Sequence, residues 1–165
     1  MKFIDLSLYA LCISYKSNMW IDNIFNNDVN NLLLKSNKLN LDTITFLKNN
    51  SKFITVYIQE KTVNLSPNIS IFIYNSYLLI SFSGIRNYKD LLCCLDYNLK
   101  YDEIFKCNIH TGILKIFYNI IEIIISIIEK YKKNRYKIIF LGHSLGAAIA
   151  KLACIYFKIK QNVTY

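Results

Sequence analysis

The 165-residue chain is long enough to form one domain with a substantial core, and its 53% hydrophobic and 15% aromatic content excludes a disordered protein. The net charge of +9 comes almost entirely from lysines that are scattered along the chain, without a basic block that contains interleaved aromatic residues. We therefore expect no nucleic acid partner. A weak attraction to anionic membrane surfaces still follows from the charge.

The first residues, MKFIDLSLYALCISYKSN (1–18), predict an amphipathic helix rather than a signal peptide. Asp5 interrupts the apolar run, and no small-x-small cleavage site follows it. We therefore expect a cytoplasmic protein. The Asn-rich stretch 23–42 predicts a loop with a short helix. The five cysteines form no C-x-x-C pair and have no histidine at ligand spacing, so no metal site is expected.

Three runs rich in β-branched and aromatic residues predict strands at 53–59, 70–74 and 77–82. The last two runs are separated by Asn75 and Ser76, which predict a tight hairpin turn. A short helix is expected at 87–95.

A long apolar helix is expected from about Thr111 to Lys132. Its polar residues are spaced four, three and four positions apart, which places them in one narrow stripe: Lys115, Asn119, Glu122 and Ser126. Lysine and glutamate are costly deep in a bilayer. We therefore expect this helix to pack between protein layers rather than in lipid.

The run YKIIFLG (136–142) predicts a buried strand, and the small and apolar residues after Ser144 predict a helix. The C-terminal half thus has the order strand, helix, strand, helix, and it follows an antiparallel hairpin. This order predicts an α/β sheet with crossover helices.

Between the last strand and helix lies GHSLG (142–146), which has the G-x-S-x-G form of a nucleophile elbow. A serine at the apex of a sharp strand-to-helix turn requires very small residues two positions before and after it, and Gly142 and Gly146 meet this requirement. The first N–H groups of the helix, beginning with that of Leu145, can stabilise an oxyanion. Ser144 is therefore the candidate nucleophile.

The chain has only four glycines, and the other two also stand at turns. Gly84 lies in FSGI, where a predicted strand ends, and Gly112 lies in IHTGI, where the long helix begins. In order and spacing, FSGI, IHTGI and GHSLGAAIA resemble the motifs of class 3 lipases, the fungal-lipase-like family of α/β-hydrolases. The resemblance covers roughly 50–158. It implies that 1–165 is a single, incomplete α/β-hydrolase domain whose C-terminal strands are missing.

By this resemblance the chain is a serine hydrolase that cleaves carboxylic esters, with lipid esters expected, through an acyl-enzyme on Ser144. The family uses no metal or organic cofactor. The backbone N–H groups of Leu145 and Ile85 would form the oxyanion hole. Ile85 stands where the family has Ser or Thr, and Ser83 stands where it has Arg. The segment NYKDLL places Asp90 at the acid of the family's D-W segment.

The two histidines receive structural roles. The resemblance assigns His110 to an H-x-G turn, and His143 is expected to be packed and turned away from Ser144. In the α/β-hydrolase order an acidic residue and then a histidine follow the serine. No Asp, Glu or His occurs after Ser144 in this sequence.

Two hypotheses on a hydrolase fold therefore stay open, beside a third in which the Ile-rich helix and the positive charge make a membrane-surface protein. The chain is a lipase-like enzyme whose acid and histidine come from a further or separately encoded partner segment, or it is a degenerate, inactive hydrolase fold that acts as a binding module. The expected partners are a lipid or other ester substrate and a membrane or lipid surface.

Overall fold

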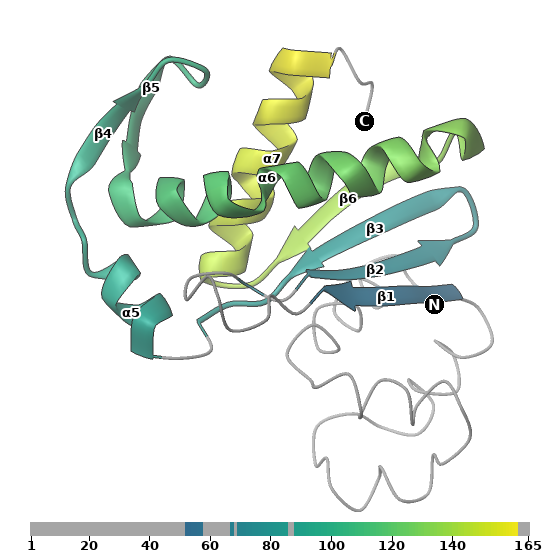
Figure 1. The fold of residues 1–165 in the computed structure, drawn as a ribbon, viewed down its shortest axis with the longest axis horizontal. Helices are drawn as coiled ribbons and strands as arrows, with labels where there is room; N and C mark the ends of the chain where they lie inside the picture. Colours follow the sequence, from purple (N-terminus) through teal and green to yellow (C-terminus); the bar gives the residue numbers. More distant parts are fainter. Residues whose placement is uncertain (1–51, 58–66, 68, 86–87, 162–165) are drawn as a thin grey trace, which may run out of the picture.

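The computed structural model describes residues 52–57, 67, 69–85 and 88–161 (Figure 1). The predicted N-terminal helix and the Asn-rich stretch 23–42 lie outside these residues. The elements follow one another in this order: β1 (Lys52–Tyr57), β2 (Ile69–Tyr74), β3 (Tyr77–Phe82), α5 (Tyr88–Cys94), β4 (Leu99–Asp102), β5 (Cys107–His110), α6 (Thr111–Tyr131), the 3₁₀ turn η1 (Lys132–Asn134), β6 (Lys137–Gly142) and α7 (Leu145–Gln161).

Four of the strands form one mixed sheet in the order β1-β2-β3-β6 (Figure 1). The pairs β1-β2 and β2-β3 are antiparallel, whereas β6 runs parallel to β3 with Gly142 opposite Phe82. The chain reaches β6 from β3 through α5, the β4–β5 hairpin and α6. The predicted α/β sheet with a crossover helix is thus confirmed, and the carboxyl ends of β3 and β6 lie side by side at one edge.

The core lies between one face of the sheet and the helices α6 and α7. Alternate residues of β2 and β3, among them Ile71, Ile80 and Phe82, belong to this core because successive side chains of a strand point to opposite faces. Helix α6 adds isoleucines at helical spacing, of which Ile120 and Ile124 are at most 1% exposed. Burial of these side chains is the main force that holds α6 on the sheet.

The polar stripe predicted for the long helix is confirmed, since all four of its residues are exposed: Lys115, Asn119, Glu122 and Ser126. Among the described residues, one helical segment, Thr111–Asn134, is long and apolar enough to cross a membrane, and half of its most apolar window is buried inside the protein. The buried half is the face of α6 that packs on the sheet. The apolar composition of this segment is therefore accounted for by the protein core.

A hairpin that the sequence analysis did not predict links α5 to α6. Strands β4 and β5 pair only with each other, away from the main sheet (Figure 1). Their turn includes Lys106, which has a left-handed φ of 53°. Asp102 closes the turn by accepting hydrogen bonds from the backbone N–H groups of Ile104 (2.9 Å) and Phe105 (3.0 Å).

Candidate active site

Ser144 occupies the sharp connection between β6 and α7 and is exposed. Its φ is 54°, in the left-handed region that non-glycine residues rarely adopt. The other described non-glycine residues with positive φ lie in the β2–β3 turn, in the β4–β5 turn and after η1: Asn75, Lys106 and Arg135. A strained, exposed serine between a strand and a helix is the arrangement that a nucleophile elbow requires.

Backbone contacts explain the two glycines of the elbow. A Cβ atom on Gly142 would overlap the carbonyl group of Gly146, and one on Gly146 would overlap the carbonyl oxygen of Phe82 and lie 2.7 Å from that of Ser83. Because these neighbours are backbone atoms, no change of side-chain rotamer can relieve the overlap. The elbow therefore packs directly against the end of β3, where the segment leading to Ile85 begins.

Two backbone N–H groups are available near this point. Leu145 is the first residue of α7, and its N–H has no hydrogen-bond partner among the described residues, as is typical of a helix N-terminus. The N–H of Ile85 likewise has no partner within the described part of the chain. The first capping bonds of α7 come from the next residues, since Gly146 donates to the carbonyl of His143 (2.9 Å) and Ala147 to that of Ser144 (3.0 Å).

His110 has a structural role in this geometry. Its Nδ1 caps α6 by accepting a hydrogen bond from the backbone N–H of Ile113 (3.4 Å), and its Nε2 lies 3.1 Å from the carbonyl oxygen of Cys94 at the end of α5. Because Nδ1 acts as an acceptor, Nε2 carries the hydrogen and donates a hydrogen bond to the carbonyl oxygen of Cys94. A Cβ on Gly112 would overlap the carbonyl oxygen of Cys93. The H-x-G turn thus docks the start of α6 against the end of α5, as the resemblance implies.

The other polar residues named in the sequence analysis differ in how far they are buried. His143 is exposed, so the prediction that it is packed is wrong. Its position at the carboxyl end of an edge strand leaves the side chain uncovered by the described residues. Asp90, in the first turn of α5, is 1% exposed, and Ser83 is fully buried. No group of three or more His, Cys, Asp or Glu side chains within the described ranges is placed to hold a metal ion.

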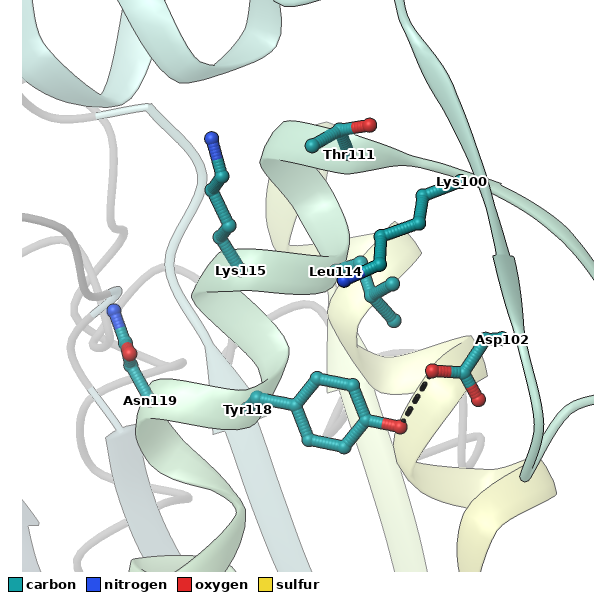
Figure 2. A pocket seen from close by; sticks show the side chains of 7 residues that line it. All are labelled: Lys100, Asp102, Thr111, Leu114, Lys115, Tyr118 and Asn119. Atoms are coloured by element: carbon teal, nitrogen blue, oxygen red, sulfur yellow. Dashed lines mark hydrogen bonds between the residues drawn. The ribbon is translucent and has the colours of Figure 1, made fainter.

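A cavity of about 430 Å³ lies between β4 and α6, and six of the seven residues that line it carry a polar group (Figure 2). Figure 2 shows the hydroxyl of Tyr118 on α6 pointing to Asp102, to which it donates a hydrogen bond of 2.7 Å. Lys115, also on this cavity, forms an ion pair with Asp96 (3.4 Å). Ser144 is not among the lining residues. The Asp102–Tyr118 bond thus links the hairpin to α6, and the Lys115–Asp96 pair links the segment after α5 to the same helix.

The Asp102–Tyr118 pair shifts the pKa values of both groups. Partial burial acts to raise the pKa of Asp102, but the hydrogen bonds from Tyr118 and from the backbone of Phe105 and Ile104 outweigh it and hold the pKa below its usual range. The pKa of Tyr118 is raised, first by burial and then by its bond to the carboxylate. Asp102 therefore stabilises the fold more when it is ionised than when it is protonated.

The variant Tyr118→Phe tests this pair. We expect it to unfold at lower urea concentration than the parent chain at pH 6, by about 1 kcal/mol for the lost hydrogen bond. A depressed carboxyl pKa gives stability that is present above the unfolded value of about 3.9 and is lost as the pH falls through the folded value. The difference between the two proteins should therefore narrow as the pH is lowered from about 6 to 3. The matched variant Tyr101→Phe, at an exposed tyrosine of β4, should show neither effect; a gap independent of pH would contradict this account.

Comparison with known proteins gives a family and a fold. The sequence profile described as lipase (class 3) matches residues 79–164, which run from within β3 to just beyond α7 and include the elbow. No curated protein sequence matches the chain.

Among solved structures, the chain is similar to the triacylglyceride lipase of Rhizomucor miehei, with 16% identity, a TM-score of 0.64, and 98% of this chain and 57% of that chain covered. The lipase of Rhizopus microsporus var. chinensis matches with 15% identity and a TM-score of 0.60, over 98% of this chain and 54% of that one. The mono- and diacylglycerol lipase of Aspergillus oryzae matches with 18% identity and a TM-score of 0.58, over 92% of this chain and 56% of that one. The fold is thus that of the α/β-hydrolases, and the chain spans little more than half the length of these lipases.

Proposed function

Because the chain belongs to the class 3 lipase family, we propose that it carries the nucleophile of a lipase-like hydrolase and cleaves carboxylic esters at Ser144. The observation that supports this most directly is the left-handed φ of the exposed Ser144 at the carboxyl end of β6. Strain at a non-glycine residue persists where the surrounding structure imposes it, and such residues concentrate at functional sites.

The proposed mechanism is acyl transfer in two steps. The Oγ of Ser144 attacks the ester carbonyl, the C–O bond to the alcohol breaks, and the alcohol leaves with a proton. Water then attacks the acyl-enzyme and releases the carboxylic acid, which regenerates the serine. In each step negative charge develops on the carbonyl oxygen, and the N–H groups of Leu145 and Ile85 are the proposed donors to it. Ile85 contributes no hydroxyl, so this oxyanion hole rests on backbone groups.

The serine also needs a base to accept its proton. The residues after Ser144 include no Asp, Glu or His, and both ring nitrogens of His110 are engaged in the α5–α6 contact. We therefore propose that a further segment of polypeptide, continuous with this sequence or supplied by a partner, brings the acid and the histidine to the elbow. A different observation favours the second candidate function, an inactive hydrolase fold that serves as a binding module: Ile85 stands at the second oxyanion position and supplies no hydroxyl.

Exposed apolar side chains at Ile85 and along α5 support a lipid surface as the place where the chain meets its substrate. Ile85 is 39% exposed, and in α5, which follows it, Leu91 and Leu92 are 41% and 47% exposed. Leu95, just beyond α5, is 47% exposed. Apolar groups on a short amphipathic helix can insert at the boundary between lipid headgroups and acyl chains.

Labelling with a fluorophosphonate probe tests the proposed nucleophile. The probe reacts with an activated serine, so we expect the folded chain to be labelled when the segment that supplies the acid and the histidine is present, and the Ser144→Ala variant to lose that labelling completely. Ser126→Ala, which removes an exposed serine of α6, should label like the parent chain.

Peptide mapping should place the adduct on Ser144. A folded chain that stays unlabelled even when that segment is present would favour the inactive binding module, and an adduct on another serine would overturn the assignment of Ser144.

A further inference from the structure

A second cavity, of about 410 Å³, lies between the β4–β5 hairpin, the start of α6 and one side of α7. Six apolar side chains form most of its wall: Phe105, Ile109, Ile113, Ala148, Leu152 and Ile155. Five of the six are only partly buried or exposed, Leu152 being the exception. This volume and apolar wall fall in the range of small-molecule sites, and the described residues leave the cavity unfilled.

Helix α7 begins at the elbow, and the cavity runs along one side of this helix. Ala148, Leu152 and Ile155 stand four, eight and eleven positions after Ser144, a spacing that keeps them on one face of a helix. With a rise of about 1.5 Å per residue, the cavity begins about one helical turn from Ser144 and extends away from it. Ser144 itself does not line the cavity. It is therefore a separate site beside the elbow.

The charge of this cavity is positive. Lys151 is its one charged lining residue, is exposed, and has no ion-pair partner among the described residues. Asn108 adds an amide to the rim, whereas His110 has both ring nitrogens engaged elsewhere. A mostly apolar wall with one ammonium group at its edge is complementary to a molecule that has a hydrocarbon chain and a single negative end.

We propose that this cavity binds a fatty carboxylate, with the hydrocarbon chain along α7 and the carboxylate at Lys151. Such a molecule is the acid that hydrolysis of a lipid ester releases. Its identity as a reaction product rests on the proposed function, whereas its complementarity to the cavity does not.

Calorimetric titration of the chain with dodecanoate and with dodecanol tests the proposal, because the two probes share a twelve-carbon chain and only one of them has a charged head group. We expect both to bind, and Lys151→Gln to weaken dodecanoate about threefold to fivefold while dodecanol changes less than twofold, as for a partly exposed ion pair. Ile155→Gln places a polar group in the apolar wall and should weaken both probes about tenfold.

Each variant has a matched control on α7. Lys158→Gln and Ile159→Gln change an exposed lysine and an exposed isoleucine that do not line the cavity, and they should bind both probes like the parent chain. Equal losses in a variant and its control would overturn the proposal. Failure of the parent chain to bind dodecanoate would also overturn the proposal. If, in that case, Ile155→Gln also disperses an oligomer, the occupant of the cavity is a second copy of the chain.

The labelling experiment separates this proposal from the proposed function. Dodecanoate binding that follows the expected pattern in a chain whose Ser144 is never labelled would support the cavity site and contradict the hydrolase. Labelling of Ser144 without dodecanoate binding would do the reverse.

Discussion

Replacement of Gly146 by alanine is expected to destabilise the chain by about 3 kcal/mol, the upper range for an overpacked site. The added Cβ would overlap the carbonyl oxygen of Phe82 and lie 2.7 Å from that of Ser83. Helix propensity alone predicts the opposite sign, since alanine is favoured over glycine inside a helix by about 1 kcal/mol. The sign of the change in the free energy of unfolding, measured in urea, therefore distinguishes the close approach of two backbones from an effect on the helix.

The neighbouring residue provides the control. Ala147 is exposed on α7, so Ala147→Gly should cost only the propensity difference of about 1 kcal/mol. Gly146→Ala should also lower the labelling of Ser144 in the fraction that remains folded, because the start of α7 must move away from β3. A Gly146→Ala variant as stable as the parent chain would show that the elbow and β3 are not in contact in solution.

Strong local patterns made much of the fold predictable from sequence. The strand at 77–82 and the long helix from Thr111 were predicted at or within one residue of their observed ends, because β-branched runs and a regular polar stripe are unambiguous. The glycines were predictable for a related reason. At three of the four glycines, Gly112, Gly142 and Gly146, a Cβ atom would overlap the backbone of another residue.

Features that depend on contacts distant in sequence were not predictable. The β4–β5 hairpin has short strands without a clear alternation, and the bond between Asp102 and Tyr118 joins residues sixteen positions apart. A local signal for the turn did exist, since an aspartate can close a turn by accepting N–H groups two and three positions later. Both cavities involve this hairpin, so their lining residues, Lys151 included, could not have been selected from sequence.

The candidate site was predictable in one respect and not in another. The sharp turn at Ser144 was predictable, because it requires very small residues two positions before and after the serine and the sequence has glycine at both. The relation of Leu145 to Ile85 depends on the parallel pairing of β3 with β6, which the order strand, helix, strand implies only in general terms. The exposure of His143 depends on whether another strand covers β6, and periodicity carries no information on that point.

Replacement of Ile124 by alanine should cost about 3 kcal/mol, in the middle of the range for a buried isoleucine. Ile124 is fully buried in the core between α6 and the sheet, so the lost methyl groups leave a cavity that the surrounding isoleucines fill only in part. The matched variant Ile125→Ala changes a half-buried residue of the same helix and should cost clearly less. Chemical denaturation of the two variants measures the difference.

A third variant distinguishes a core helix from one that spans a bilayer. Ser126 is exposed on the polar stripe, so Ser126→Lys should change stability by less than about 0.5 kcal/mol if water covers this face. In a membrane-spanning helix the same lysine near the centre would cost about 3 kcal/mol. Ile124→Ala would cost little there, because lipid would fill the space that the smaller side chain leaves. Ile124→Ala is therefore the more destabilising change if α6 packs on the sheet, and Ser126→Lys is the more destabilising change if α6 spans a bilayer. A large effect of Ser126→Lys together with a small effect of Ile124→Ala would contradict the packing of α6 on the sheet.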